Sequence, residues 1–190
     1  MRRPSLTTND DKFIPIVMML AAHGYETFRY EETARLVTKK GPEPWGTGYK
    51  TRNIIYRREL FARGDTIYKL WAKDFLWASN ILDGVLSEFY DSTLTSALVG
   101  VILDDDADVR GYVMHKAKRL NNEHQWAQMI GLLCERTKET KMCFPDCIKQ
   151  NMGVYKGKLT LFDLENVVAA KRGLQTKFKG YDKVVSEVGD

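Results

Sequence analysis

The sequence has few cysteines and no apolar run long enough to cross a membrane. Its three cysteines, Cys134, Cys143 and Cys147, form no CxxC pair. This disfavours a zinc site or a disulfide framework and favours a reducing compartment. The apolar stretch near the N-terminus follows two aspartates and is soon interrupted by His23 and Gly24. A signal peptide or a membrane span is therefore not expected, and the cytoplasm is the expected location.

The sequence also has no low-complexity segment, no internal repeat and no long run of charges of one sign. The 190 residues are 44% hydrophobic and 28% charged, which indicates one globular domain or two small lobes that share a cleft. The net charge is +4, but acidic and basic residues alternate along most of the chain. Without an arginine-rich arm, nucleic acid is not expected as a partner.

The spacing of apolar residues predicts a mixture of helices and strands. We expect helices over residues 13–30, 74–90 and 122–139. Strands are expected over residues 34–40, 51–60, 65–71, 97–103 and 109–117. The last two are joined by the acidic turn DDDAD, which lacks the glycine and closing glutamate of a calcium loop and is expected to be solvated. Residues after Asp163 are predicted to form a weakly patterned polar tail.

A hairpin is predicted in FPDCIKQNMGVYKGKLTLFD, residues 144–163. If Lys156 and Gly157 form its turn, Asn151 returns opposite Phe162, beside Asp163. Asp146 precedes Asn151 in the loop that enters the hairpin and can reach the same end. Carboxylate and amide oxygens gathered there suit Mg²⁺. The alternative is that these residues are ordinary turn formers flanking strands.

This segment resembles the catalytic and metal-binding segments of protein kinases. The shared features are Asp146-x-x-x-x-Asn151 and a strand pair that ends in Asp163. The resemblance implies a single α+β domain over residues 1–190, with a two-lobed protein-kinase-like fold. A helical extension over residues 1–33 would precede an N-lobe over 34–117, made of an antiparallel sheet plus a helix. Residues 118–190 would form a strongly reduced helical C-lobe with the catalytic loop and a short tail.

Such a fold needs a lysine on its third strand and a glutamate on the following helix. Lys69 shares the apolar face of the strand at 65–71, where a charge must be paired. Glu88 continues the predicted helical stripe of Trp77, Ile81 and Val85 and is the expected partner. The alternative for Lys69 is a snorkelling lysine at a strand edge.

The remaining nucleotide contacts are implied by the resemblance alone. Gly46, Thr47 and Gly48 would form a glycine-rich phosphate loop between the first two strands, although an ordinary Pro/Gly loop is the alternative. The hinge that receives adenine would comprise Met114, His115 and Lys116, and Lys149 would approach a phosphate. Asp146, Lys69 and Glu88 would be catalytic, and Asn151 and Asp163 would hold Mg²⁺ or Mn²⁺ beside ATP.

Several positions depart from the kinase pattern. Phe144 and Pro145 stand where the family has His and Arg, so the catalytic loop must be supported by packing. Leu164 and Glu165 replace the Phe and Gly of D-F-G, and no A-P-E follows. The chain therefore resembles minimal kinase-like proteins of bacteria, their effectors and viruses, and an effector would act in a host cytosol.

The expected function is transfer of the ATP γ-phosphate to a serine or threonine hydroxyl of an unidentified protein substrate. A pseudokinase that binds a partner protein is one alternative, and a small-molecule or lipid kinase is another. Cys143 and Cys147 flank Asp146 and either regulate it or are inert buried thiols.

Overall fold

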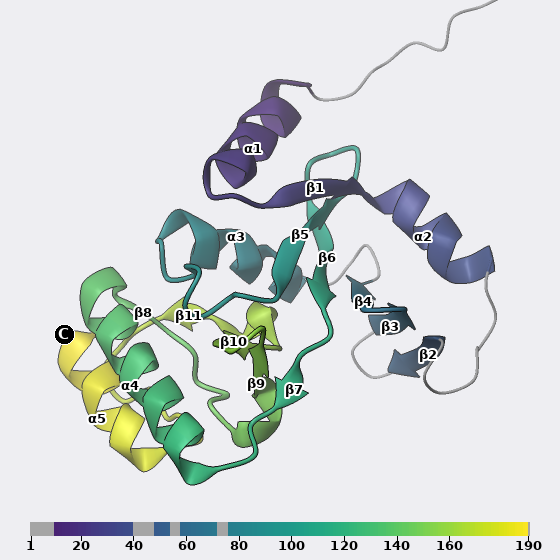
Figure 1. Cartoon of the computed structure of the whole chain (residues 1–190). Coiled ribbons are helices and arrows are strands. Elements are labelled where there is room, and N and C mark those ends of the chain that lie inside the picture. The colour runs from purple at the N-terminus through teal and green to yellow at the C-terminus, as the bar shows by residue number, and fades with distance from the viewer. Residues whose placement is uncertain (1–9, 40–47, 54–57, 72–75, 190) are drawn as a thin grey trace, which may run out of the picture. The chain divides into compact units, whose positions relative to one another are not determined.

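The computed structural model describes residues 10–39, 48–53, 58–71 and 76–189, and the chain is a mixed α+β protein (Figure 1). It divides into two compact units. Unit 1 comprises Met1–Phe75 and Leu98–Met114, and unit 2 comprises Leu76–Ala97 and His115–Asp190. Residues 76–97 thus belong to unit 2, so the division does not follow the predicted lobe boundary after residue 117.

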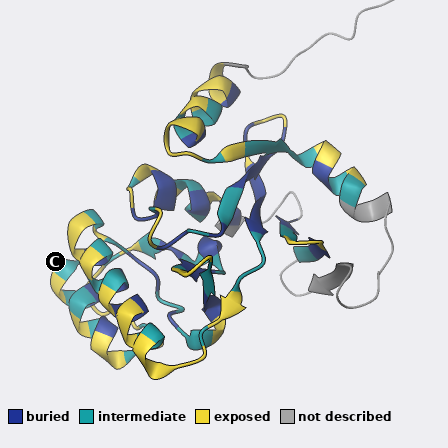
Figure 2. Cartoon of the chain, in the orientation of Figure 1, coloured by how far each residue is buried: buried dark blue, intermediate teal, exposed yellow. Residues whose placement is uncertain are grey.

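Unit 1 is built on a six-stranded sheet. Its helices are α1 (Asp10–Ala22) and α2 (Tyr30–Lys39). Its strands are β1 (Glu26–Arg29), β2 (Gly48–Asn53), β3 (Arg58–Arg63), β4 (Thr66–Trp71), β5 (Leu98–Leu103) and β6 (Val109–His115). The strand order is β1-β5-β6-β4-β3-β2, with β1 parallel to β5. Its core gathers around Phe61, Leu70, Ile102 and Val113, and β5 and β6 are buried along most of their length (Figure 2).

The predicted helix over residues 13–30 is too long. Helix α1 ends at Ala22 because Gly24 adopts a φ of +82°, which a glycine reaches without steric cost. The Tyr25 N–H then donates to the Leu20 carbonyl at 2.9 Å, as in a Schellman motif. The chain leaves the helix and forms β1.

The predicted strand over residues 34–40 is wrong, because this segment lies in α2 up to Lys39. Glu31 and Glu32 in the first turn of α2 favour a helix through its dipole. The predicted strand over residues 51–60 contains parts of two strands, β2 and β3, which pair antiparallel. The strands predicted over 65–71, 97–103 and 109–117 are confirmed as β4, β5 and β6.

Unit 2 contains helices and two small sheets. The helical elements are the 3₁₀ turn η1 (Leu76–Ser79), α3 (Asn80–Leu86), α4 (Glu123–Thr140), η2 (Lys149–Asn151), η3 (Leu164–Asn166) and α5 (Lys179–Val188). The strands are β7 (Lys118–Arg119), β8 (Met142–Cys143), β9 (Met152–Tyr155), β10 (Lys158–Leu161) and β11 (Val168–Ala169). One sheet has the order β10-β9-β7 and the other pairs β11 with β8. Helices α4 and α5 pack side by side (Figure 1).

The predicted helix over residues 122–139 is confirmed by α4, whose N-cap Asn122 accepts a hydrogen bond from the Gln125 N–H at 2.8 Å. The predicted helix over 74–90 is too long, since α3 ends at Leu86. The chain turns back after α3, where Glu88 has a φ of +59° and the Tyr90 N–H donates to the Gly84 carbonyl at 3.0 Å. The Tyr90 ring then packs on Gly84, where a Cβ would lie 2.2 Å from it. The predicted tail is also wrong, because it contains β11 and α5.

None of the helices in the described ranges combines the length and apolarity that a bilayer crossing requires.

Candidate functional site

The candidate site lies at the open end of the β9–β10 hairpin in unit 2. Lys156 and Gly157 form the turn, with φ values of +47° and +79°. Such a two-residue turn fixes the register, and Met152 pairs with Leu161. One step outward, the Phe162 N–H donates to the Asn151 carbonyl at 2.8 Å. The predicted pairing of Asn151 with Phe162, next to Asp163, is therefore confirmed.

Asn151 is bound directly to Asp146. Its side-chain Nδ2 donates to the Asp146 backbone carbonyl at 3.0 Å and to Asp146 Oδ2 at 2.8 Å. The Asn151 residue is only 8% exposed, so the pair is a fixed feature of the loop. Because Nδ2 is the donor in both bonds, Asn151 Oδ1 is the amide atom that can coordinate a cation, and Asp146 Oδ1 is the carboxylate oxygen that can accept from a hydroxyl.

Asp163 occupies a tight turn directly after β10. Its φ of −89° and ψ of 69°, with a Leu164 N–H to Phe162 carbonyl bond of 3.0 Å, define an inverse γ-turn. The residues that follow are held by α3 and its neighbourhood: Tyr90 donates to the Leu164 carbonyl and Asn80 to the Glu165 carbonyl. Asp163 itself is half-buried. Leu164 and Glu165 stand where the kinase pattern has Phe and Gly. Hydrogen bonds to their carbonyls nevertheless hold the segment that follows Asp163.

The oxygen donors at this end of the hairpin fit a hard divalent cation such as Mg²⁺. Mg²⁺ uses one or two carboxylates and keeps places for water and phosphate oxygens. Asp163 and the free amide oxygen of Asn151 supply that number of protein ligands. No cluster of three or more His, Cys, Asp and Glu side chains that could hold a metal occurs in the described part of the chain.

Lys69 lies in unit 1, on an interior strand of the sheet. It is 3% exposed, and its Nζ donates to the Tyr112 hydroxyl at 2.8 Å. The same Nζ lies 5.4 Å from the Trp71 ring centroid and 5.2 Å from that of Tyr112. Strand β4 lies between β6 and β3, so Lys69 is not a lysine at a sheet edge. The sequence analysis missed Tyr112, although its place on the strand next to β4 could have indicated it.

Glu88 does not continue a helical stripe. It lies beyond the end of α3 with a φ of +59° and is exposed. The prediction that Glu88 lies on the buried face of a helix is therefore wrong. Its pairing with Lys69 stays a prediction, as does the meeting of Lys69 in unit 1 with the hairpin residues in unit 2.

The predicted phosphate loop is not a connection between two strands. Gly48 is the first residue of β2, where it pairs with Arg63, so the segment precedes the three-stranded meander. Gly46 and Thr47 lie outside the described residues. The glycines are predicted to lie between two strands only if residues 34–40 form a strand. Those residues lie in α2, so the first strand of the meander is β2, which begins at Gly48.

His115 of the predicted hinge and the predicted phosphate-binding Lys149 already have partners in unit 2. The His115 N–H donates to the Ala97 carbonyl at 2.8 Å and is not available to a base. Lys149 forms an ion pair with Glu123 and lies 6.0 Å from the Trp126 ring centroid. Lys149 would have to leave Glu123 before it could bind a phosphate. Met114 ends up buried at the end of β6, and Lys116 is half-buried.

The C-terminal segment supports the Asp146 loop, which the sequence analysis missed. The Phe144 N–H donates to Tyr181 Oη at 3.1 Å, and Tyr181 Oη lies 2.5 Å from Thr137 Oγ1. On the next residue, the Pro145 carbonyl accepts from the Lys177 N–H at 2.9 Å. Burial raises the pKa of Tyr181, partly offset by its bond to Thr137, so its hydroxyl stays neutral. The spacing of Tyr181 and Val185 on α5 could have indicated a buried face.

The two cysteines beside Asp146 are fully buried thiols. The pKa of Cys143 is raised to about 12, mainly by burial and also by the neighbouring Cys147, while Lys171 opposes the shift. Burial also raises the pKa of Cys147. Because the thiolate is the reactive form, the geometry favours inert packing over regulation.

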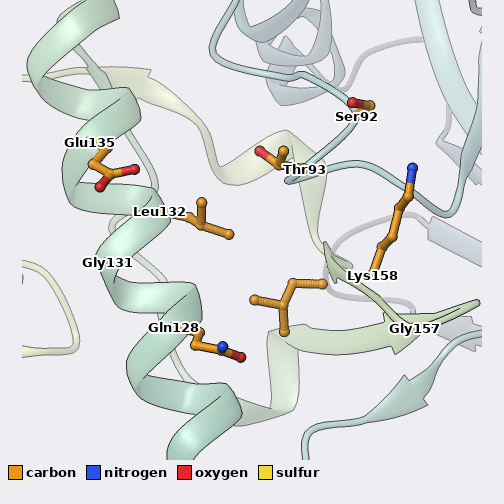
Figure 3. Close-up of a pocket in the computed structure, with 9 residues that line it drawn as sticks. Ser92, Thr93, Gln128, Gly131, Leu132, Glu135, Gly157 and Lys158 are labelled. Atoms are coloured by element: carbon orange, nitrogen blue, oxygen red, sulfur yellow. The ribbon is translucent and has the colours of Figure 1, made fainter.

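A surface groove of about 500 Å³ lies at the other end of the hairpin (Figure 3). It runs between α4 and the hairpin turn, and Leu132 on α4, Leu159 on β10 and Thr93 are among the residues that line it. None of the predicted site residues lines it. The candidate site therefore rests on the hydrogen-bonded residues at the hairpin mouth and not on this groove.

Comparison with known proteins gives little further evidence. No protein-family model matches the chain, and no curated protein matches it. Among solved structures, the chain is similar to that of vaccinia related kinase 3, with 14% identity and a TM-score of 0.41. The match covers 75% of this chain and 58% of that chain. A likeness this distant carries no weight for fold or function, so a kinase-like assignment depends on the residues themselves.

Proposed function

We propose that the chain is an ATP-dependent phosphotransferase of protein-kinase-like fold. The observation that carries the proposal is the double hydrogen bond from Asn151 to Asp146, together with the backbone bond from Phe162 to Asn151 that places Asp163 one residue further along. Turn-forming residues need no such mutual contact. The arrangement supplies one carboxylate for an incoming hydroxyl and a separate pair of oxygen ligands for a cation, which are the protein groups that phosphoryl transfer requires.

Each residue has a defined task in this proposal. Asp146 Oδ1 accepts a hydrogen bond from the acceptor hydroxyl and takes its proton, while Asn151 Nδ2 fixes the orientation of the same carboxylate. Asn151 Oδ1 and Asp163 would hold Mg²⁺, which when bound neutralises phosphate charge. Lys69, kept in place by Tyr112, would bind the α- and β-phosphates of ATP. The proposed acceptor is a serine or threonine of a protein.

The test is transfer from γ-labelled ATP to the protein itself and to lysate proteins, with Mg²⁺ or Mn²⁺ present. Asp146→Ala should abolish transfer while leaving ATP-dependent thermal stabilisation almost unchanged, because Asp146 contacts no part of the nucleotide in this proposal. Asp163→Asn should reduce both. Asp106→Ala, at an exposed aspartate of the β5–β6 turn, is the matched control and should change neither. Full transfer by Asp146→Ala would refute the role of Asp146.

A nucleotide-free pseudokinase is the second candidate. The observations that favour it are the exposed position of Glu88 beyond α3 and the ion pair that holds Lys149 at Glu123. The resemblance implied that Glu88 fixes Lys69 and that Lys149 approaches a phosphate. Glu88 does not lie on a helix face as that role implied, and Lys149 is already paired with Glu123. An absence of thermal stabilisation by ATP with either metal would decide for this candidate, since a ligand that binds only the native state must raise its apparent stability.

A further inference from the structure

We propose that unit 2 binds an acidic polypeptide segment as an added strand along β7. The basic edge is the set Lys116, Lys118, Arg119 and Lys156, which lie on β7, just before it, and at the turn of the β9–β10 hairpin (Figure 1). The two segments that carry it, residues 115–120 and 152–162, contain no acidic residue. This proposal is independent of the proposed function.

No ion pair among the described residues neutralises the charges of the basic edge. Lys118, Arg119 and Lys156 are exposed. The ion pairs of the described residues involve none of them, and the nearest carboxylate along the chain, Glu123, is paired with Lys149. A concentration of one charge without counter-charges favours a partner of opposite sign.

The strand pairing selects an extended partner. β7 is two residues long and is the terminal strand of the order β10-β9-β7, so the backbone N–H and C=O groups that it does not direct at β9 point outward. Lys118 pairs with Val154 and Arg119 with Gly153, so the two cations lie on opposite faces of the sheet. An added strand alternates in the same way, about 4.8 Å away. Consecutive acidic residues of such a strand would therefore meet Lys118 on one face and Arg119 on the other.

The same geometry disfavours a nucleic acid. A sugar-phosphate backbone lacks the alternating N–H and C=O groups that continue a sheet. Single strands bind proteins largely by stacking their bases on aromatic side chains. The ring of Tyr155 on β9 is already stacked on His115, with centroids 4.9 Å apart, and Lys156 Nζ lies 5.2 Å from its centroid. The basic edge offers charge and backbone groups, and these fit an acidic peptide.

The test is fluorescence anisotropy with a labelled peptide of about eight glutamates, at about 0.05 M salt and again at about 0.3 M. Lys118→Glu/Arg119→Glu should weaken binding at least about tenfold. Lys171→Glu/Arg172→Glu changes the net charge equally at exposed positions away from the sheet and should weaken it less than about threefold. Circular dichroism and thermal melting check that both variants fold.

Two further probes separate strand addition from simple attraction of charge. A glutamate peptide N-methylated at alternate residues keeps every charge but loses alternate N–H donors, and it should bind at least about fivefold more weakly. An RNA oligonucleotide of similar charge should bind more weakly than the unmodified peptide. Equal losses in the two double variants, equal affinity of the methylated peptide, tighter binding of the RNA, or no binding of the glutamate peptide would each overturn the proposal.

Discussion

Replacing Tyr181 with phenylalanine tests how the Asp146 loop is supported. The change keeps the buried ring and removes only the hydroxyl, which accepts from the Phe144 N–H at 3.1 Å and lies 2.5 Å from Thr137 Oγ1. All three residues are fully buried, so water cannot replace the lost partner. A buried polar group left without a partner costs about 1–3 kcal/mol. Two groups, the Phe144 N–H and the Thr137 hydroxyl, lose their partner, and small shifts of neighbouring side chains recover part of the loss. The free energy of unfolding should therefore fall by about 2–3 kcal/mol.

Urea denaturation followed by tryptophan fluorescence measures this loss, and hydrogen exchange measures its location. The Phe144 amide, which loses its acceptor, should exchange faster in Tyr181→Phe than in the wild type. If the proposed function holds, the rate of phosphate transfer should also drop at least about tenfold, because Asp146 is two residues from Phe144. ATP affinity should stay the same, since neither Asn151 nor Asp163 contacts Tyr181.

Val185→Ala is the matched control for general loosening of α5. Val185 is buried on the same helix as Tyr181. Its truncation should cost a similar amount, about 2 kcal/mol, while leaving the hydroxyl in place. It should therefore change neither the Phe144 exchange, measured relative to global unfolding, nor the transfer rate below the melting temperature. A Tyr181→Phe protein with unchanged stability and unchanged Phe144 exchange would refute the reasoning, whether or not the chain transfers phosphate.

Three further changes test other parts of the structure. Because the pKa of Cys143 is raised from 9.0 to about 12, its thiol ionises more readily in the unfolded chain. The free energy of unfolding should therefore fall as the pH rises from 9 to 12. The fall should be smaller in Cys143→Ser, which lacks the thiol. Gly157→Ala at a φ of +79° should lower the melting temperature at a cost of about 1 kcal/mol, whereas Gly131→Ala in open space on α4 should raise it by a similar amount. Asp104→Asn weakens the ion pair with Arg110, 2.6 Å between Nε and Oδ2, and should cost about 3 kcal/mol in a urea titration, because both side chains are buried.

The parts of the site that could be predicted are those set by local rules. The two-residue turn at Lys156–Gly157 fixes the strand register, and the register places Asn151 opposite Phe162. Asp146 then lies within reach because only four residues separate it from Asn151. The same holds for α4, whose Asn122 N-cap and apolar face are both readable from the sequence.

The errors occurred where packing by distant residues decides the structure. Residues 34–40 carry short apolar runs that suit either a strand or a helix. Glu31 and Glu32 in the first turn favour the helix α2. The chain turns back after α3, and the ring of Tyr90 then packs beside Gly84. No local pattern indicates such a contact. The displaced glycine segment and the misplaced Glu88 are direct consequences of these two errors.

The departures of this chain from the kinase pattern and its C-terminal helix have a common physical explanation. With Phe144 and Pro145 in place of His and Arg, the residues before Asp146 offer no polar side chain to anchor the loop, and their backbone groups need partners from elsewhere. The Phe144 N–H finds Tyr181, and the Pro145 carbonyl finds the Lys177 N–H. Both partners come from the segment that the sequence analysis took for a polar tail. The C-terminal segment thus holds the two residues that precede Asp146, although its sequence pattern does not indicate this role. Its removal should disorder the candidate site while unit 1 stays folded.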